Sequence, residues 1–206
     1  MLAVSTLSMA NARGYHHGDL KAALVRAALA AVEASGPDAV SLRDLAQSLG
    51  VSTAAPYRHF PDRRALLAEV AAIGFRELDA AYARARAEAP DPEAALRETA
   101  RAYLALAFGR PGLFKLMFDS DIIDANPPAS LLAPARAAWE SLFRAVGALD
   151  PEADLATIKR RTITGWSTLH GFIALVQHER LKAFMTEPLT EAELLEAILD
   201  KSLQQT

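Results

Sequence analysis

The residues best equipped for chemistry lie near the end of segment 41–60, where a phenol, a guanidinium and an imidazole follow one another at Tyr57, Arg58 and His59. These groups supply hydrogen-bond donors suited to phosphate oxygens and base edges. The residues at 53–55 are all small, so the backbone there can approach another surface closely. This combination favours contact with nucleic acid over catalysis.

The elements that must position these groups are two short helices with a sharp stop between them. Ser41 can cap the first helix, with Asp44 three residues on. Gly50 suits the left-handed residue that ends it, and Ser52 can cap a second helix over Thr53–His59. The apolar positions of the first helix keep helical spacing, at Leu42, Leu45, Ala46 and Leu49. Two such helices joined by a glycine turn have the layout of a helix-turn-helix, although the same signals can build a plain helical corner.

The segment around this turn resembles the signature of TetR-type transcriptional regulators. The resemblance covers residues 19–67 and rests on Gly50-Val51-Ser52, Tyr57-Arg58-His59-Phe60, Arg63 and Leu66. There are two departures from the family pattern. Arg63 replaces the usual Lys and keeps the positive charge. Pro56 replaces the usual aliphatic residue and lacks an N–H, but it lies near the helix start, where few ladder bonds are lost.

The resemblance implies a homodimeric regulator, most simply a repressor, that a small-molecule effector releases from a near-palindromic double-stranded DNA operator. Arg43, Tyr57, His59 and Arg63 would hold phosphates, and Thr53 and Ala54 would meet base edges. Ser52 and Arg58 complete the expected DNA-binding set.

Composition bounds the remaining possibilities. The 206 residues are 51% hydrophobic, which is ample for a buried core, and there is no Cys, which excludes disulfides and thiolate chemistry. Net charge is −3, yet residues 1–65 hold seven Lys/Arg against five Asp/Glu, whereas the remainder holds 15 against 20. The basic excess therefore lies with the helix-turn-helix, as a phosphate-binding end requires. We expect no signal peptide and no membrane span, and hence a cytoplasmic protein.

Helical periodicity continues along the chain and predicts an all-α protein of about nine helices without strands. We expect a disordered arm over 1–13, a three-helix DNA-binding head over 14–66, and a larger helical effector-binding and dimerisation body over 67–206. The expected helices are Asp19–Ser35, Arg63–Glu88, Pro92–Gly109, Leu113–Phe118, Ser130–Ala148, Asp150–Glu179 and Thr190–Leu203, besides the two of the helix-turn-helix. The expected caps of three of them are Asp62, Asp91 and Thr190, the last with Glu193 three residues on.

A second motif, Trp166 followed by His170-Gly171, resembles the Trp-His-Gly signature of one C-terminal domain type of TetR-like regulators. In that family the last two long helices pair with those of a second subunit. The expected dimer contacts are Trp166, Leu169, Ile173 and Val176 on one helix, and Leu194, Leu195 and Ile198 on the other. Both stripes would alternatively be internal core. Gly171 inside a helix predicts a close helix crossing.

The resemblance also implies an inducer pocket between the body helices. Its candidate lining residues are Tyr103, Phe108, Phe114, Met117, Phe118, Trp139, Phe143, Trp166 and His170. Aromatic residues at helical spacing are more often plain core, and His170 is most simply a core histidine with a hydrogen-bond partner.

Enzymatic motifs are weak, so we expect no catalytic residues, no metal and no cofactor. His170 and His178 share a helix face without a third ligand placed to complete a zinc site. Asp119, Asp121 and Asp124 lie in a loop that lacks the glycine and terminal Glu of a calcium loop. The alternative function is an all-helical small-molecule binder or enzyme whose helix-turn-helix does not dock on DNA.

Overall fold

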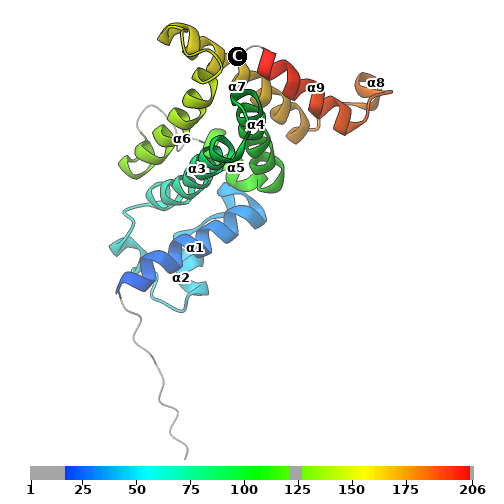
Figure 1. Cartoon of the computed structure of the whole chain (residues 1–206). Coiled ribbons are helices and arrows are strands. Elements are labelled where there is room, and N and C mark those ends of the chain that lie inside the picture. The colour runs from blue at the N-terminus through cyan, green and yellow to red at the C-terminus, as the bar shows by residue number, and fades with distance from the viewer. Residues whose placement is uncertain (1–16, 121–126, 205–206) are drawn as a thin grey trace, which may run out of the picture.

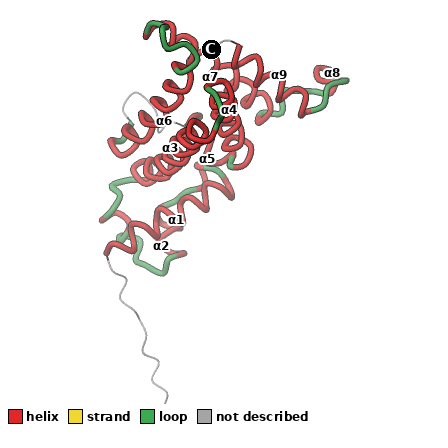
Figure 2. The backbone as a smooth tube through the Cα atoms, in the orientation of Figure 1, coloured by secondary structure: helices red, strands yellow, loops and turns green. Residues whose placement is uncertain are grey.

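A computed structural model describes residues 17–120 and 127–204, and this part of the chain is all-helical. It contains nine α-helices and two 3₁₀ turns. These residues form no strand, and Figure 2 accordingly shows only helices and loops. The predicted all-α fold is therefore confirmed. The arm expected over 1–13 and most of the acidic loop lie outside the described residues.

The head consists of helix α1 (His17–Ser35), the 3₁₀ turn η1 (Pro37–Ala39) and helix α2 (Leu42–Ser48). The predicted cap is confirmed, because the Ser41 hydroxyl accepts a hydrogen bond from the Asp44 N–H at 3.4 Å. Gly50 has φ +68°, a left-handed conformation that a side chain would strain. Leu24 and Phe60 are buried between these elements, so the helices pack on a small apolar centre.

Helix α3 (Arg63–Glu88) connects the head to the body (Figure 1). Asp62 caps it as expected, with its carboxylate accepting from the Ala65 N–H at 2.7 Å. Helix α3 packs mainly against α4 (Pro92–Gly109) and α6 (Ala129–Gly147). One apolar core runs from Leu20 in the head to Leu199 near the carboxyl end. The boundary predicted between residues 66 and 67 falls inside α3 and stays a prediction.

The body adds α5 (Pro111–Phe118), α7 (Leu155–Gln177), α8 (Ala183–Thr186) and α9 (Glu191–Gln204). Helices α7 and α9 lie at the end of the molecule opposite α1 and α2, with α8 outermost (Figure 1). The capping box at Thr190 and Glu193 is confirmed, because each residue's backbone N–H donates to the other's side chain.

The start of α7 corrects one predicted boundary. The sequence predicts a start at Asp150, but the helix begins at Leu155. The Asp154 carboxylate accepts from the Thr157 N–H at 2.7 Å, so Asp154 is the cap that starts the helix. In the described ranges, no helix is both long enough and apolar enough to cross a membrane.

Candidate nucleic-acid interface and ligand cavity

The head exposes most of the predicted DNA-binding residues on α2 and on the segment that follows it. Arg43 on α2 is exposed. Beyond the turn at Gly50, six of the predicted DNA-binding residues are exposed as well: Ser52, Thr53, Ala54, Tyr57, Arg58 and Arg63. His59 is half-buried. These side chains are open to solvent, which DNA contact requires, and the contacts themselves stay predictions.

The second helix of the helix-turn-helix differs from the prediction. Instead of an α-helix over residues 53–59, the chain forms a turn followed by a single 3₁₀ turn, η2 (Pro56–Arg58). The Ser52 carbonyl accepts from the Ala55 N–H at 2.9 Å, an i+3 bond. An α-helix would use the N–H of residue 56 for that carbonyl, and proline has none. Pro56 is also buried, so its ring anchors the segment to the head.

Arg63 has an intramolecular role that the sequence did not reveal. Its guanidinium donates to the Val40 carbonyl at 2.9 Å and to the Pro37 carbonyl at 2.5 Å. These carbonyls lie at the two ends of η1, so Arg63 joins the start of α3 to the connection between α1 and α2. Its predicted phosphate contact must compete with these two bonds, and it stays a prediction.

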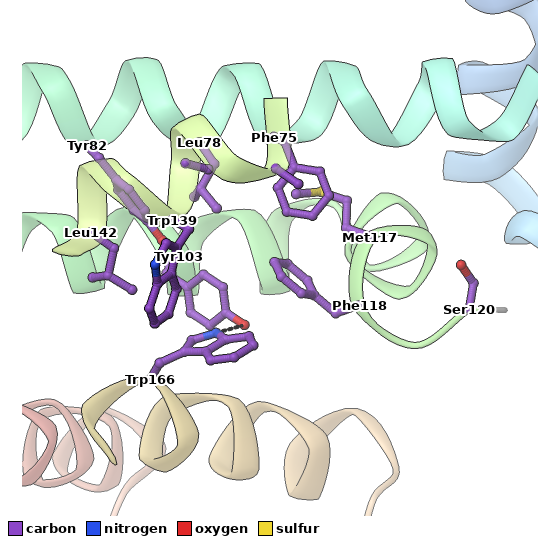
Figure 3. Close-up of a pocket in the computed structure, with 12 residues that line it drawn as sticks. Phe75, Leu78, Tyr82, Tyr103, Met117, Phe118, Ser120, Trp139, Leu142 and Trp166 are labelled. Carbon is purple, nitrogen blue, oxygen red and sulfur yellow. Dashed lines mark hydrogen bonds between the residues drawn. The ribbon is translucent and has the colours of Figure 1, made fainter. Parts of the chain in front are cut away.

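The body contains an apolar cavity of about 300 Å³ between α3, α6 and α7. Its size is at the lower end of the range for small-molecule sites. Figure 3 shows side chains of α3 and Trp166 of α7 converging on it from opposite sides. Its lining residues are Phe75, Leu78, Tyr82, Tyr103, Met117, Phe118, Ser120, Ala135, Ala138, Trp139, Leu142 and Trp166.

Aromatic rings form much of the cavity wall and contact one another edge to face. Phe118 has its ring centroid 5.5 Å from that of Phe75 and 5.6 Å from that of Tyr103. Trp139 and Trp166 form a third such pair at 6.4 Å. Edge-to-face pairs at these separations add stability beyond area burial, so the wall is held in one arrangement.

One polar corner interrupts the aromatic wall. The Trp166 Nε1–H donates to the Tyr103 hydroxyl at 2.9 Å, and the same hydroxyl lies 2.8 Å from His170 Nδ1 (Figure 3 shows the first bond). On the other side of the imidazole, His170 Nε2 lies 3.7 Å from the Asp119 carboxylate. Burial raises the pKa of Tyr103 well above its ordinary value, so its hydroxyl stays neutral.

The predicted lining residues divide into two groups. Five of them line the cavity: Tyr103, Met117, Phe118, Trp139 and Trp166. The other four are placed elsewhere. Phe114 is fully buried behind Tyr103, His170 stands behind the Tyr103 hydroxyl, and Phe108 is exposed near His178. Phe143 is half-buried outside the lining set.

Sequence reasoning missed the contribution of α3, which supplies Phe75, Leu78 and Tyr82. Their helical spacing predicts only a stripe that carries α3 into the body. An apolar helix face that points inward has the same residue spacing whether it meets other side chains or a cavity. The spacing of these residues therefore could not indicate that they line the cavity.

The predicted dimer contacts on α7 are located on its inner face. Leu169 is 6% exposed and Ile173 is fully buried within the subunit, so neither is available to a partner. Trp166 lines the cavity, and Val176 is half-buried. On α9, Leu195 and Ile198 pack against the core, and Leu194 is half-buried. Gly171 meets nothing within 4 Å, so the close crossing predicted there is wrong within the subunit.

Helix α5 links the cavity to the head. Met117 and Phe118 at its carboxyl end line the cavity. At its other end, a Cβ on Gly112 would lie 2.1 Å from the Val32 carbonyl oxygen of α1, so only glycine fits. Arg110 pairs with Glu33 at 2.5 Å and also contacts Glu77, and Lys115 pairs with Asp38 at 3.2 Å. A displacement of α5 would therefore act directly on α1 and η1.

Comparison with known proteins agrees with this architecture. The family model described as "Bacterial regulatory proteins, tetR family" matches residues 24–70, and the one described as "Tetracyclin repressor-like, C-terminal domain" matches residues 96–201. The second match includes the Trp166 and His170-Gly171 motif. No curated protein is similar enough to count as a match.

Three solved structures place the whole chain in context. A protein of unknown function from Rhodococcus sp. RHA1 is 29% identical, with TM-score 0.76, over 93% of this chain and 97% of that one. The TetR family transcriptional regulator PfmR from Thermus thermophilus is 25% identical, with TM-score 0.60, over 88% and 97%.

The transcriptional regulator FadR from Bacillus subtilis, solved with stearoyl-CoA, shares the fold at 12% identity and TM-score 0.66, over 90% and 98%. Together with the two family models, which cover the head and most of the body, these likenesses extend over almost the full length of the chain. The chain therefore belongs to the TetR family of bacterial regulatory proteins and is a ligand-responsive, DNA-binding transcriptional regulator.

Proposed function

We propose that the protein is a homodimeric repressor that binds a near-palindromic operator and leaves it when a small molecule occupies the body cavity. The observation that carries this proposal is the link through α5, whose two ends contact the cavity and the head. An effector can shift the equilibrium only if it prefers the conformation that does not bind DNA. A ligand that displaces Phe118 would move α5, and α5 would in turn shift α1 in the head.

The proposed dimer surface is the outer face of α7 together with the segment around α8. Ile163 is 51% exposed and Leu175 is 45% exposed, whereas Ile173 on the same helix is fully buried. Along the chain beyond α7, Phe184 is 78% exposed. Large exposed apolar side chains gathered in one region are typical of an interaction site. This face replaces the inner stripe that the sequence suggested.

DNA binding is tested by fluorescence anisotropy with duplexes from the region upstream of the protein's own gene. Arg58→Ala is expected to weaken binding and to reduce the slope of log K against log salt by about 0.9 for the lost phosphate contact. Arg136→Ala is the matched control, because Arg136 is an exposed arginine on α6 in the body. An unchanged salt slope for Arg58→Ala would contradict its assignment to phosphate.

Absent or salt-independent DNA affinity of the wild-type protein would contradict the proposal and would leave a small-molecule-binding protein whose head does not dock on DNA. We further propose that the chain is not an enzyme, in keeping with its family, and that it acts in the cytoplasm.

A further inference from the structure

The body cavity has room for a small ligand. Its volume of about 300 Å³ lies at the lower end of the range for small-molecule sites. A compact ligand with one or two rings fits this space. The two Ala residues of the wall, Ala135 and Ala138, lie on α6 and leave room for a ring between α6 and α7.

The wall of the cavity offers no partner for a charge. Among the described residues that line it, none is Asp, Glu, Lys, Arg or His. Three charged groups close in sequence to lining residues are engaged elsewhere: Arg86 donates to the Ser141 carbonyl at 2.9 Å, Asp79 accepts from the Ser141 hydroxyl, and Asp119 faces His170. Burying an ion without a partner costs several kcal/mol, roughly. The described part of the wall therefore gives an ion of either sign no partner.

The polar corner is already satisfied without a ligand. The Tyr103 oxygen accepts from Trp166, and its own proton is directed at His170 Nδ1 in the tautomer that carries hydrogen on Nε2, facing Asp119. A hydroxyl oxygen has two acceptor sites, so one remains. A ligand can donate a hydrogen bond there. The rest of the described wall is mostly apolar, and its other polar groups are the Tyr82 and Ser120 hydroxyls and the Trp139 indole N–H.

We propose that the ligand is an uncharged, compact, largely apolar molecule that contains a ring and carries one hydroxyl-like donor directed at Tyr103. This deepens the proposed function and rests on it only in calling the ligand an effector. Cation–π attraction to the aromatic wall does not make a cation the better ligand, because this attraction contributes about 2 kcal/mol. That is less than the cost of removing water from an unpaired ion.

The test uses three probes with the same apolar body: 4-tert-butylbenzyl alcohol, 4-tert-butylbenzoate and (4-tert-butylbenzyl)trimethylammonium. Both tryptophans of the chain, Trp139 and Trp166, line the cavity, so tryptophan fluorescence reports binding without DNA. We expect the alcohol to bind on the order of tenfold or more tightly than either ion. Equal or tighter binding of the carboxylate or the ammonium probe, or of stearoyl-CoA, would overturn the proposal.

A cavity-filling variant locates the site. Ala135→Leu places a larger side chain in the cavity and is expected to lower affinity for the alcohol about tenfold or more. Ala133→Leu is the matched control, because Ala133 lies on the same helix but is exposed and outside the lining. Equal loss in both variants, or in neither, would show that the probe binds elsewhere and would overturn the assignment of this cavity.

Failure of this inference is distinguishable from failure of the proposed function. If the alcohol binds in the cavity but never releases DNA in the anisotropy experiment, the ligand class holds and the effector response fails. If a charged compound releases DNA instead, the proposed release by an effector holds and the proposal of an uncharged ligand fails.

Discussion

At the scale of single residues, the buried tyrosines are the most informative groups in the body. Tyr103 lines the cavity, and its hydroxyl accepts a hydrogen bond from the Trp166 indole N–H. Tyr82 of α3 lines the same cavity. Burial raises the pKa of both hydroxyls above the ordinary value of 10.0. Proximity to Tyr103 adds to the rise in the pKa of Tyr82. The folded protein therefore holds two phenolic protons that the unfolded chain releases at high pH.

This sets a pH dependence of stability. Below pH 10.0, the ordinary pKa, both the folded and the unfolded protein keep the two phenolic protons, so these groups do not change stability. Above that pH only the unfolded protein loses them, so the free energy of unfolding falls as pH rises. Tyr82→Phe is expected to make this fall shallower. Urea unfolding measured by circular dichroism across alkaline pH checks it. The difference in free energy of unfolding between wild type and Tyr82→Phe at neutral pH is the control. Equal slopes of the free energy of unfolding against alkaline pH in the two proteins would contradict the prediction.

At the scale of elements, the segment after Gly50 decides how the head can meet DNA. Pro56 removes one backbone donor and leaves a 3₁₀ turn where the sequence predicts an α-helix. A backbone hydrogen bond contributes about 1 kcal/mol net, which is enough to change the helix type of so short a segment. The exposed Tyr57 and Arg58 are therefore carried on a turn whose path depends on a single residue.

Pro56→Ala is expected to restore the missing donor and convert residues 53–59 to α-helix. Operator affinity should then rise by roughly fivefold, the equivalent of about 1 kcal/mol. Backbone chemical shifts report the helix and anisotropy reports the affinity. Pro61→Ala is the matched control, because Pro61 is exposed and follows the segment. Unchanged shifts over 53–59 would show that contacts other than the proline ring hold the turn.

The contact between α5 and α1 allows a second test at this scale. Gly112→Ala would bring a Cβ to 2.1 Å from the Val32 carbonyl oxygen, so one helix must move. We expect a loss of about 1–3 kcal/mol in the free energy of unfolding, as for other overpacked sites. Chemical denaturation measures it. Gly109→Ala is the control, since its Cβ would meet nothing within 4 Å. Equal midpoints for both variants would show that the contact yields easily.

At the scale of the whole molecule, several large exposed apolar residues lie on α7 and along the chain around α8. Head and body share one continuous core, yet Ile163, Leu175, Phe184, Met185 and Leu189 remain exposed around α7 and α8. These elements lie opposite the head, with α8 outermost (Figure 1). A partner seated on this end would leave both heads free to meet the same side of a DNA duplex.

Ile163→Glu is expected to convert the proposed dimer to a monomer, because the charge would be buried without a partner. The molar mass from light scattering during size-exclusion chromatography checks it, and operator affinity should fall together with the mass. Leu132→Glu is the matched control, because Leu132 on α6 is 54% exposed and outside this face. A wild-type mass equal to one chain would refute the dimer itself.

The sequence by itself determined most of the helices and several of their ends. Asp62, Asp91 and the Thr190–Glu193 pair cap helices as predicted, because a cap is a bond between residues three apart and depends on little else. The same holds for the left-handed turn at Gly50. The resemblance to the family came from the same kind of local signal, short spacings between residue types around the turn.

Only the tertiary structure decided which apolar stripe faces the core, the cavity or solvent. Phe75 and Tyr82 line the cavity, Phe114 lies behind it, and Ile173 turns inward although its stripe suggests a partner contact. Periodicity tells which residues share a helix face, but it does not tell what covers that face. Whether the face meets another helix, a cavity or a second subunit depends on how the helices pack together.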